Sequence, residues 1–96
     1  MYVIETLRAH EEELKERYSV RRIGVFGSYV RGEQKATSDI DVLVEFEKPT
    51  FDNFMDLAFY LEELFGRRVD LLTPECVKGI RIKEIAKEIM ESVVYV

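Results

Sequence analysis

Two short polar segments of the sequence contain residue types that handle phosphate groups and divalent cations. Gly27-Ser28 follows an apolar run, and after ten intervening residues comes Asp39-Ile40-Asp41. A glycine and a serine hydroxyl at the start of a helix leave backbone N–H groups free to bind phosphate oxygens. Each segment alone is common, since Gly-Ser is usually a turn with a helix cap and Asp-x-Asp on a strand is usually solvated. The combination favours phosphate and metal chemistry.

Strict alternation over residues 39–46 predicts a strand with both aspartates on one face. A third aspartate, Asp70, interrupts another short apolar run and is placed on a later strand. If these strands are neighbours, three carboxylates converge, and like charges ~4 Å apart repel by ~4 kcal/mol at an effective dielectric near ~20. Oxygen ligands without a His or Cys cluster favour Mg²⁺ or Mn²⁺ over zinc. Two such ions on Asp39 and Asp41 would bridge a nucleoside triphosphate, with Asp70 completing the site and deprotonating an acceptor hydroxyl.

The elements that must position these residues follow from periodicity and turn residues. The predicted order is a helix over 2–18, a strand over 22–26, a short helix from residue 29, a polar loop over 32–38, a strand over 39–46, a helix capped by Thr50 or Asp52 and ended by Gly66, a strand over 69–72, a helix over about 79–91 and an extended tail. This order predicts one α/β (α+β) domain, 1–96, in which helices back a small mixed sheet of three to four strands.

Several side chains have predicted positions of their own. In the first helix, His10 lies on or beside the apolar stripe and is read as structural rather than catalytic. In the helix after Thr50, six apolar residues are expected to face the core: Phe51, Phe54, Met55, Ala58, Leu61 and Phe65. The only cysteine, Cys76, is expected to be buried or half-buried. A basic patch of Arg21, Arg22, Arg31 and Lys35 is a candidate for holding a phosphate.

Composition limits the classes of partner. The net charge is −5, with a pI near 4.9, so the overall field opposes non-specific binding to nucleic acid. A single cysteine excludes an internal disulfide, as expected for a reducing cytoplasm. The charged N-terminus does not resemble a signal peptide, and no apolar run approaches the ~20 residues that a membrane helix needs. We therefore expect a cytoplasmic protein.

The pattern G-S-x10-D-x-D, with a third aspartate on a later strand, resembles the polymerase-β-type nucleotidyltransferase superfamily. The short length and the sequence G-S-Y-V-R-G…S-D-I-D-V-L-V-E-F further resemble the minimal nucleotidyltransferases of prokaryotes, and the resemblance extends over nearly the whole chain. The resemblance implies catalytic, metal-holding roles for three aspartates (Asp39, Asp41 and Asp70), ATP contacts for Gly27 and Ser28, and a phosphate clamp at Arg31. Ser38 is expected either to orient Asp39 or to cap a turn.

The same resemblance implies a partner. Minimal nucleotidyltransferases accompany HEPN-domain ribonuclease toxins, and those acting as antitoxins transfer AMP from ATP to a tyrosine of the toxin, so we expect a hetero-oligomer with such a toxin. Two alternatives stay open at this point. One is an antitoxin that masks its toxin by contact alone, and the other is an adenylyltransferase acting on a small molecule, which usually needs a further domain or a dimer to form the acceptor pocket.

Overall fold

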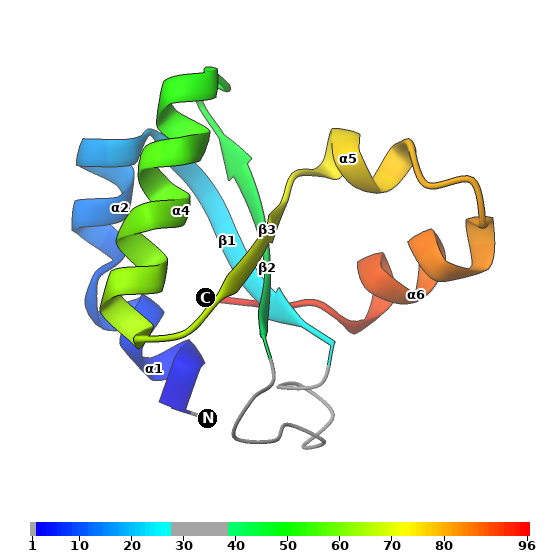
Figure 1. Cartoon of the computed structure of the whole chain (residues 1–96), viewed down its shortest axis with the longest axis horizontal. Helices are drawn as coiled ribbons and strands as arrows, with labels where there is room; N and C mark the ends of the chain where they lie inside the picture. The colour runs from blue at the N-terminus through cyan, green and yellow to red at the C-terminus, as the bar shows by residue number, and fades with distance from the viewer. Residues whose placement is uncertain (1, 28–38) are drawn as a thin grey trace.

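A four-stranded mixed sheet lies between two layers of helices in the computed structural model, which describes residues 2–27 and 39–96 (Figure 1). The strands are β1 (Val20–Phe26), β2 (Ile40–Phe46), β3 (Val69–Leu72) and β4 (Val94–Tyr95), in the order β3-β2-β1-β4. β1 runs antiparallel to β2 and β4, whereas β2 and β3 are parallel. The predicted fold class is confirmed.

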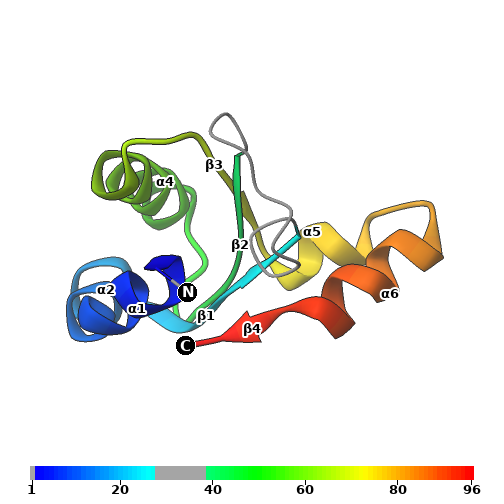
Figure 2. The ribbon, with the colours of Figure 1, turned by 90° about the horizontal axis from the view of Figure 1, so that it is seen from below.

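One face of the sheet packs against three helices: α1 (Tyr2–Ala9), α2 (Glu11–Tyr18) and α4 (Phe51–Phe65) (Figure 2). The apolar face predicted for β2 lies in this layer, and its four side chains are buried: Ile40, Val42, Val44 and Phe46. No helix in the part of the chain that the structure describes is long and apolar enough to cross a membrane.

The first helix is interrupted, which corrects the single helix predicted over 2–18. At the break, the His10 N–H bonds to the Leu7 carbonyl (3.1 Å) and the His10 imidazole Nδ1 donates to the Thr6 carbonyl (2.8 Å). In a continuous helix the Thr6 carbonyl would instead accept the His10 N–H. The side chain therefore replaces one backbone bond at the end of α1, and His10 stands at the N-cap position of α2 without a capping bond from its side chain, so its structural assignment agrees with its contacts.

The α4 helix begins at the predicted cap, and four residues of the predicted apolar stripe face the core: Phe54, Ala58, Leu61 and Phe65. The Thr50 hydroxyl accepts the Asn53 N–H (3.1 Å), and Gly66 ends the helix with φ 63°. Leu57 and Leu61 are fully buried, whereas Phe51 is 76% exposed at the first helical position. The prediction that Phe51 faces the core is wrong, because the stripe that meets the sheet is centred on Leu57 and Leu61.

Two helices cover the other face of the sheet where one was predicted. They are α5 (Pro74–Lys78) and α6 (Lys83–Ser92). Thr73 caps α5 by accepting the Cys76 N–H (3.3 Å), and Pro74 suits the first position because it has no N–H to satisfy. Val77 packs there in a second core cluster with Phe26 and Leu43. α6 is more exposed than its apolar pattern predicted, since it has no buried residue.

Candidate active site

The candidate site lies where β1 ends and β2 begins. In the β1–β2 pairing, Phe26 stands opposite Asp41, and in the parallel β2–β3 pairing Asp41 stands opposite Asp70. Side chains in register on neighbouring strands point to the same face of the sheet. The expectation that Asp70 lies on a strand next to that of Asp41 is therefore confirmed, and the register places both residues on one face at one end of the sheet.

Asp39 lies one residue before β2. The Ile40 N–H donates to the Arg68 carbonyl (3.0 Å), which ties the start of β2 to the residue that precedes β3. Asp39 and Asp41 are half-buried, and Asp70 is exposed. Asp70 is therefore the most exposed of the three carboxylates.

Gly27 closes this end of the sheet against Asp41. Its φ is +76°, in the left-handed region that favours glycine. A Cβ built on Gly27 would overlap Asp41 Oδ2 and lie 3.2 Å from Asp41 Cγ. The Asp41 carboxylate thus occupies the space that any other residue at position 27 would need. Three other predicted site residues, Ser28, Arg31 and Ser38, lie outside the described residues.

The donor set fits a hard divalent cation, because it offers carboxylate oxygens only. Across residues 2–27 and 39–96, no group of three or more His, Cys, Asp or Glu side chains is close enough together to hold a metal ion. Asp41 and Asp70 are thus the pair that the sheet register brings together, rather than part of a complete protein cage. Mg²⁺ is commonly bound by one or two carboxylates together with substrate phosphates and water.

Beyond Asp41, the same face of β2 becomes apolar and then acidic again. Leu43 is fully buried in the second core cluster, beneath Val77 of α5. Glu45 follows and pairs with Arg22 of β1 across the strands (2.6 Å). The carboxylates at the candidate site are therefore separated from Glu45 by a buried apolar residue.

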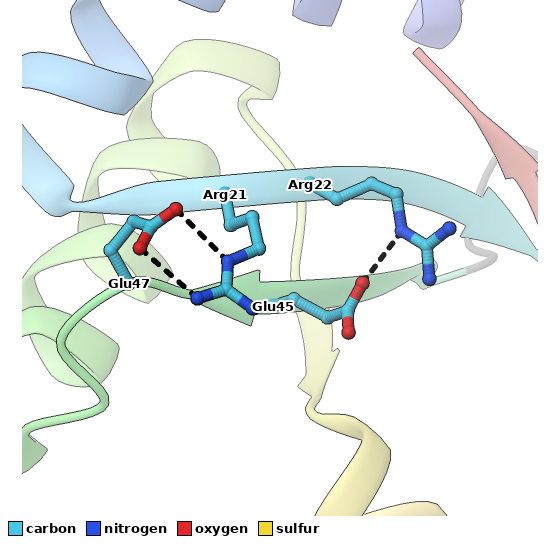
Figure 3. Close-up of polar contacts among 4 residues, drawn as sticks. All are labelled: Arg21, Arg22, Glu45 and Glu47. Atoms are coloured by element: carbon cyan, nitrogen blue, oxygen red, sulfur yellow. Dashed lines mark hydrogen bonds and ion pairs between the residues drawn. The ribbon is translucent and has the colours of Figure 1, made fainter.

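The two arginines predicted to help hold a phosphate lie at this far end and are already paired (Figure 3). Arg21 donates two hydrogen bonds to Glu47 (2.9 and 3.1 Å), and the Arg22 guanidinium also lies 3.9 Å from the centre of the Tyr95 ring. A bulge in β1 between Val20 and Arg22 shifts the register at this point. The predicted patch is wrong for these two residues, whereas Arg31 and Lys35 lie outside the described residues.

A separate pocket of about 660 Å³ opens at the Glu45 end, between the starts of α4 and α5. Its lining includes Arg21, Phe51, Phe54, Pro74 and Cys76. Cys76 is exposed, contrary to the prediction, because it lies in the first turn of a helix that the sequence pattern missed. Hydrogen bonds with Thr73 lower the pKa of its thiol. This pocket is remote along β2 from Asp41.

Comparison with known proteins gives three similarities. Residues 7–96 match the family model described as a nucleotidyltransferase domain. A protein adenylyltransferase named MntA, from Thermococcus cleftensis, is 53% identical over 91 residues, covering 94% of this chain and 88% of the relative. A solved structure described as a minimal nucleotidyltransferase is 34% identical, with a TM-score of 0.69, and the match covers 95% of this chain and 93% of that one.

A more distant structure is similar in fold. It is a chain of a toxin–antitoxin complex crystallised with AMP-PNP, 21% identical, with a TM-score of 0.66 over 91% of this chain and 69% of that one. This chain therefore shares its arrangement of strands and helices with a protein that is only distantly similar in sequence.

Proposed function

Because this chain belongs to the nucleotidyltransferase domain family, we propose that it is an antitoxin that transfers AMP from ATP to a hydroxyl group, that of a tyrosine, on a partner HEPN ribonuclease toxin. The Thermococcus relative, named a protein adenylyltransferase, supports a protein acceptor. The fold neighbour in a toxin–antitoxin complex with AMP-PNP supports a toxin partner and an adenine nucleotide. We place the activity in the cytoplasm, where ATP is found, and the complex with the toxin is a hetero-oligomer.

The observation that carries this proposal is the pairing of Asp41 with Asp70 beside Gly27. Two carboxylates in register on adjacent strands concentrate negative charge at one end of the sheet, and such a concentration favours a bound cation. A nucleotide and its divalent cation supply positive charge and phosphate oxygens together. In the proposed site, Asp39, Asp41 and Asp70 would hold Mg²⁺ together with the nucleotide phosphates rather than as a complete protein cage, while Gly27, Ser28 and Arg31 contact the phosphates and Ser38 orients Asp39.

The reaction is an in-line displacement at the α-phosphorus. The acceptor hydroxyl oxygen forms a bond to this phosphorus, the bond to pyrophosphate breaks, and the hydroxyl proton passes to Asp70, the exposed carboxylate. Asp39 and Asp41 keep the nucleotide phosphates oriented for attack. A bound divalent cation neutralises the charge that develops on the phosphoryl oxygens and on the departing pyrophosphate.

Incubation of the purified protein with Mg²⁺, α-labelled ATP and the protein encoded beside it tests this function. Transfer predicts label on the neighbour and a mass increase equal to whole AMP groups. The label should disappear with Asp39→Asn and persist with Asp56→Asn, a matched change at an exposed position on α4. If the neighbouring protein stays unlabelled but is silenced in a stable complex with this protein, that result contradicts transfer and favours an antitoxin that acts by contact. Label only on an added small molecule would favour the third function.

A further inference from the structure

We propose that Gly27 positions the carboxylate of Asp41, so that the missing side chain at residue 27 is required by the metal-binding aspartate as well as by the turn. This assignment rests on the proposed function only for the role of Asp41. Asp41 stands opposite Phe26 in the sheet, and Gly27 is the next residue along the chain. The end of β1 and the start of β2 therefore hold the Gly27 backbone and the Asp41 side chain against each other.

Two independent features of Gly27 exclude a side chain. The first is its φ of +76°, which strains any L-residue except, to some extent, Asn or Asp. The second is contact, because a Cβ would overlap Asp41 Oδ2 and lie 3.2 Å from Cγ and 3.5 Å from Cβ of Asp41. All three atoms belong to one side chain, so a larger residue 27 acts directly on Asp41.

Two other glycines separate these features. Gly66, at the end of α4, has φ +63° but nothing within 4 Å of a built Cβ. Gly24, within β1, has no left-handed φ, and its Cβ would lie 2.7 Å from the Val94 carbonyl oxygen. Gly66 therefore needs glycine for conformation alone and Gly24 for contact alone. Gly27 needs it for both, and its contact is with a site residue rather than with a structural strand.

The consequence for the site is specific. A methyl group at residue 27 forces the Asp41 side chain to rotate or the turn to open, and either movement displaces Oδ2 of Asp41 from its present position. Metal sites lose affinity steeply when a ligand is displaced or its support is altered, commonly by roughly 10–100-fold. Gly27→Ala should therefore weaken cation binding through Asp41, even though residue 27 has no cation ligand in its side chain.

A double-mutant cycle tests the contact without any transfer reaction. Gly27→Ala is made alone and together with Asp41→Ala, and Gly66→Ala is made in the same two backgrounds as a control for backbone strain. Thermal unfolding should show Gly27→Ala melting about 3 °C below Gly66→Ala, and Asp41→Ala should recover that excess. The effect of Gly66→Ala should be equal in both backgrounds. If Gly27→Ala does not fold alone, recovery of folding in the double variant supports the contact, and no recovery overturns it.

Mn²⁺ binding in the presence of ATP, followed by electron paramagnetic resonance, tests the positioning role. We expect Gly27→Ala to weaken Mn²⁺ binding by about 10-fold, Gly66→Ala to leave it unchanged, and Gly27→Ala to cause no further loss once Asp41 is alanine. Equal Mn²⁺ affinity in Gly27→Ala and the unmodified protein would overturn the role. If the stability coupling is found and Gly27→Ala weakens Mn²⁺ binding as expected, but the unmodified protein transfers AMP to no acceptor, the proposed function alone is refuted and the positioning role is kept.

Discussion

The start and the end of β2 present acidic side chains on the same face of the sheet but in opposite electrostatic surroundings. At the end, Glu45 is paired with Arg22, and the next acidic residue, Glu47, is paired with Arg21. At the start, Asp41 stands opposite Asp70, another carboxylate. Opposite charges face each other across the strands at one end, whereas like charges face each other across the β2–β3 register at the other. Like charges in register thus identify the candidate site better than acidic composition does.

Neutralising either aspartate should separate activity from stability and give the largest effect. Asp41→Asn and Asp70→Asn keep the shape of the side chain but remove its negative charge. That charge binds the cation and, at Asp70, accepts the proton of the acceptor hydroxyl. We expect AMP transfer to fall by at least about 100-fold, whereas the melting temperature should stay close to that of the unmodified protein, because asparagine keeps the size of the side chain and an oxygen that accepts hydrogen bonds. Single-turnover labelling and thermal unfolding measure the two quantities. A sharp fall in melting temperature in both variants would mean that these carboxylates are structural.

Exchanging the electrostatic character of the two ends should change stability in opposite directions. Glu45→Lys places a second cation beside Arg22 and should destabilise the fold by about 1 kcal/mol, the usual size of a cross-strand charge effect. Asp70→Lys creates an opposite-charge pair with Asp41 and should stabilise the fold by about a few tenths of a kcal/mol, the lower end of the range for cross-strand charge effects. Urea unfolding measures both, and a loss of stability in Asp70→Lys would contradict the repulsion.

Local patterns predicted the strands that carry Asp41 and Asp70 better than they predicted the charge pairs and helix ends around them. The alternation along β2 correctly indicated the face that carries Asp41, and the short apolar run around Asp70 correctly indicated a strand, because both signals are confined to a single strand. The pairing of Arg21 and Arg22 was missed because their partners lie 26 and 23 residues away. No local pattern reports such contacts, so a paired set of charges looked like a free basic patch.

Helix boundaries failed for a related reason. Periodicity indicates which residues face a core, but a break depends on single hydrogen bonds, such as that from His10 to Thr6. For α5 the sequence does contain a helix-start signal, because Thr73-Pro74 is a typical cap and first helical residue. The same two residues also end the β3 strand, and the prediction assigned them that role alone. This helix places Val77 over Leu43. The roles of all the candidate site residues stay predictions: Gly27, Ser28, Arg31, Ser38, Asp39, Asp41 and Asp70.

The smallest expected effect concerns the outermost pair, Arg21 and Glu47. The two hydrogen bonds from Arg21, reinforced by its charge, lower the pKa of Glu47 below the ordinary 4.5. A carboxylate whose pKa is lower in the folded state contributes stability above its unfolded pKa and loses it as the pH falls through the folded value. The contribution of this pair should therefore be complete at pH 7 and decline below about pH 4.5.

Replacing the arginine isolates that decline. Arg21→Gln removes the charge that stabilises ionised Glu47, so the variant should lose slightly less stability than the unmodified protein between neutral pH and pH 3. Both side chains are more than half exposed, so the difference should shrink as salt is added. Melting temperatures across that pH range at low and high salt measure it, with Lys15→Gln as a matched control at another exposed ion pair. If the curves of melting temperature against pH are parallel for Arg21→Gln and the unmodified protein, this end of β2 owes its stability to packing and backbone pairing. The electrostatic contrast between the two ends of β2 would then rest on the aspartates alone.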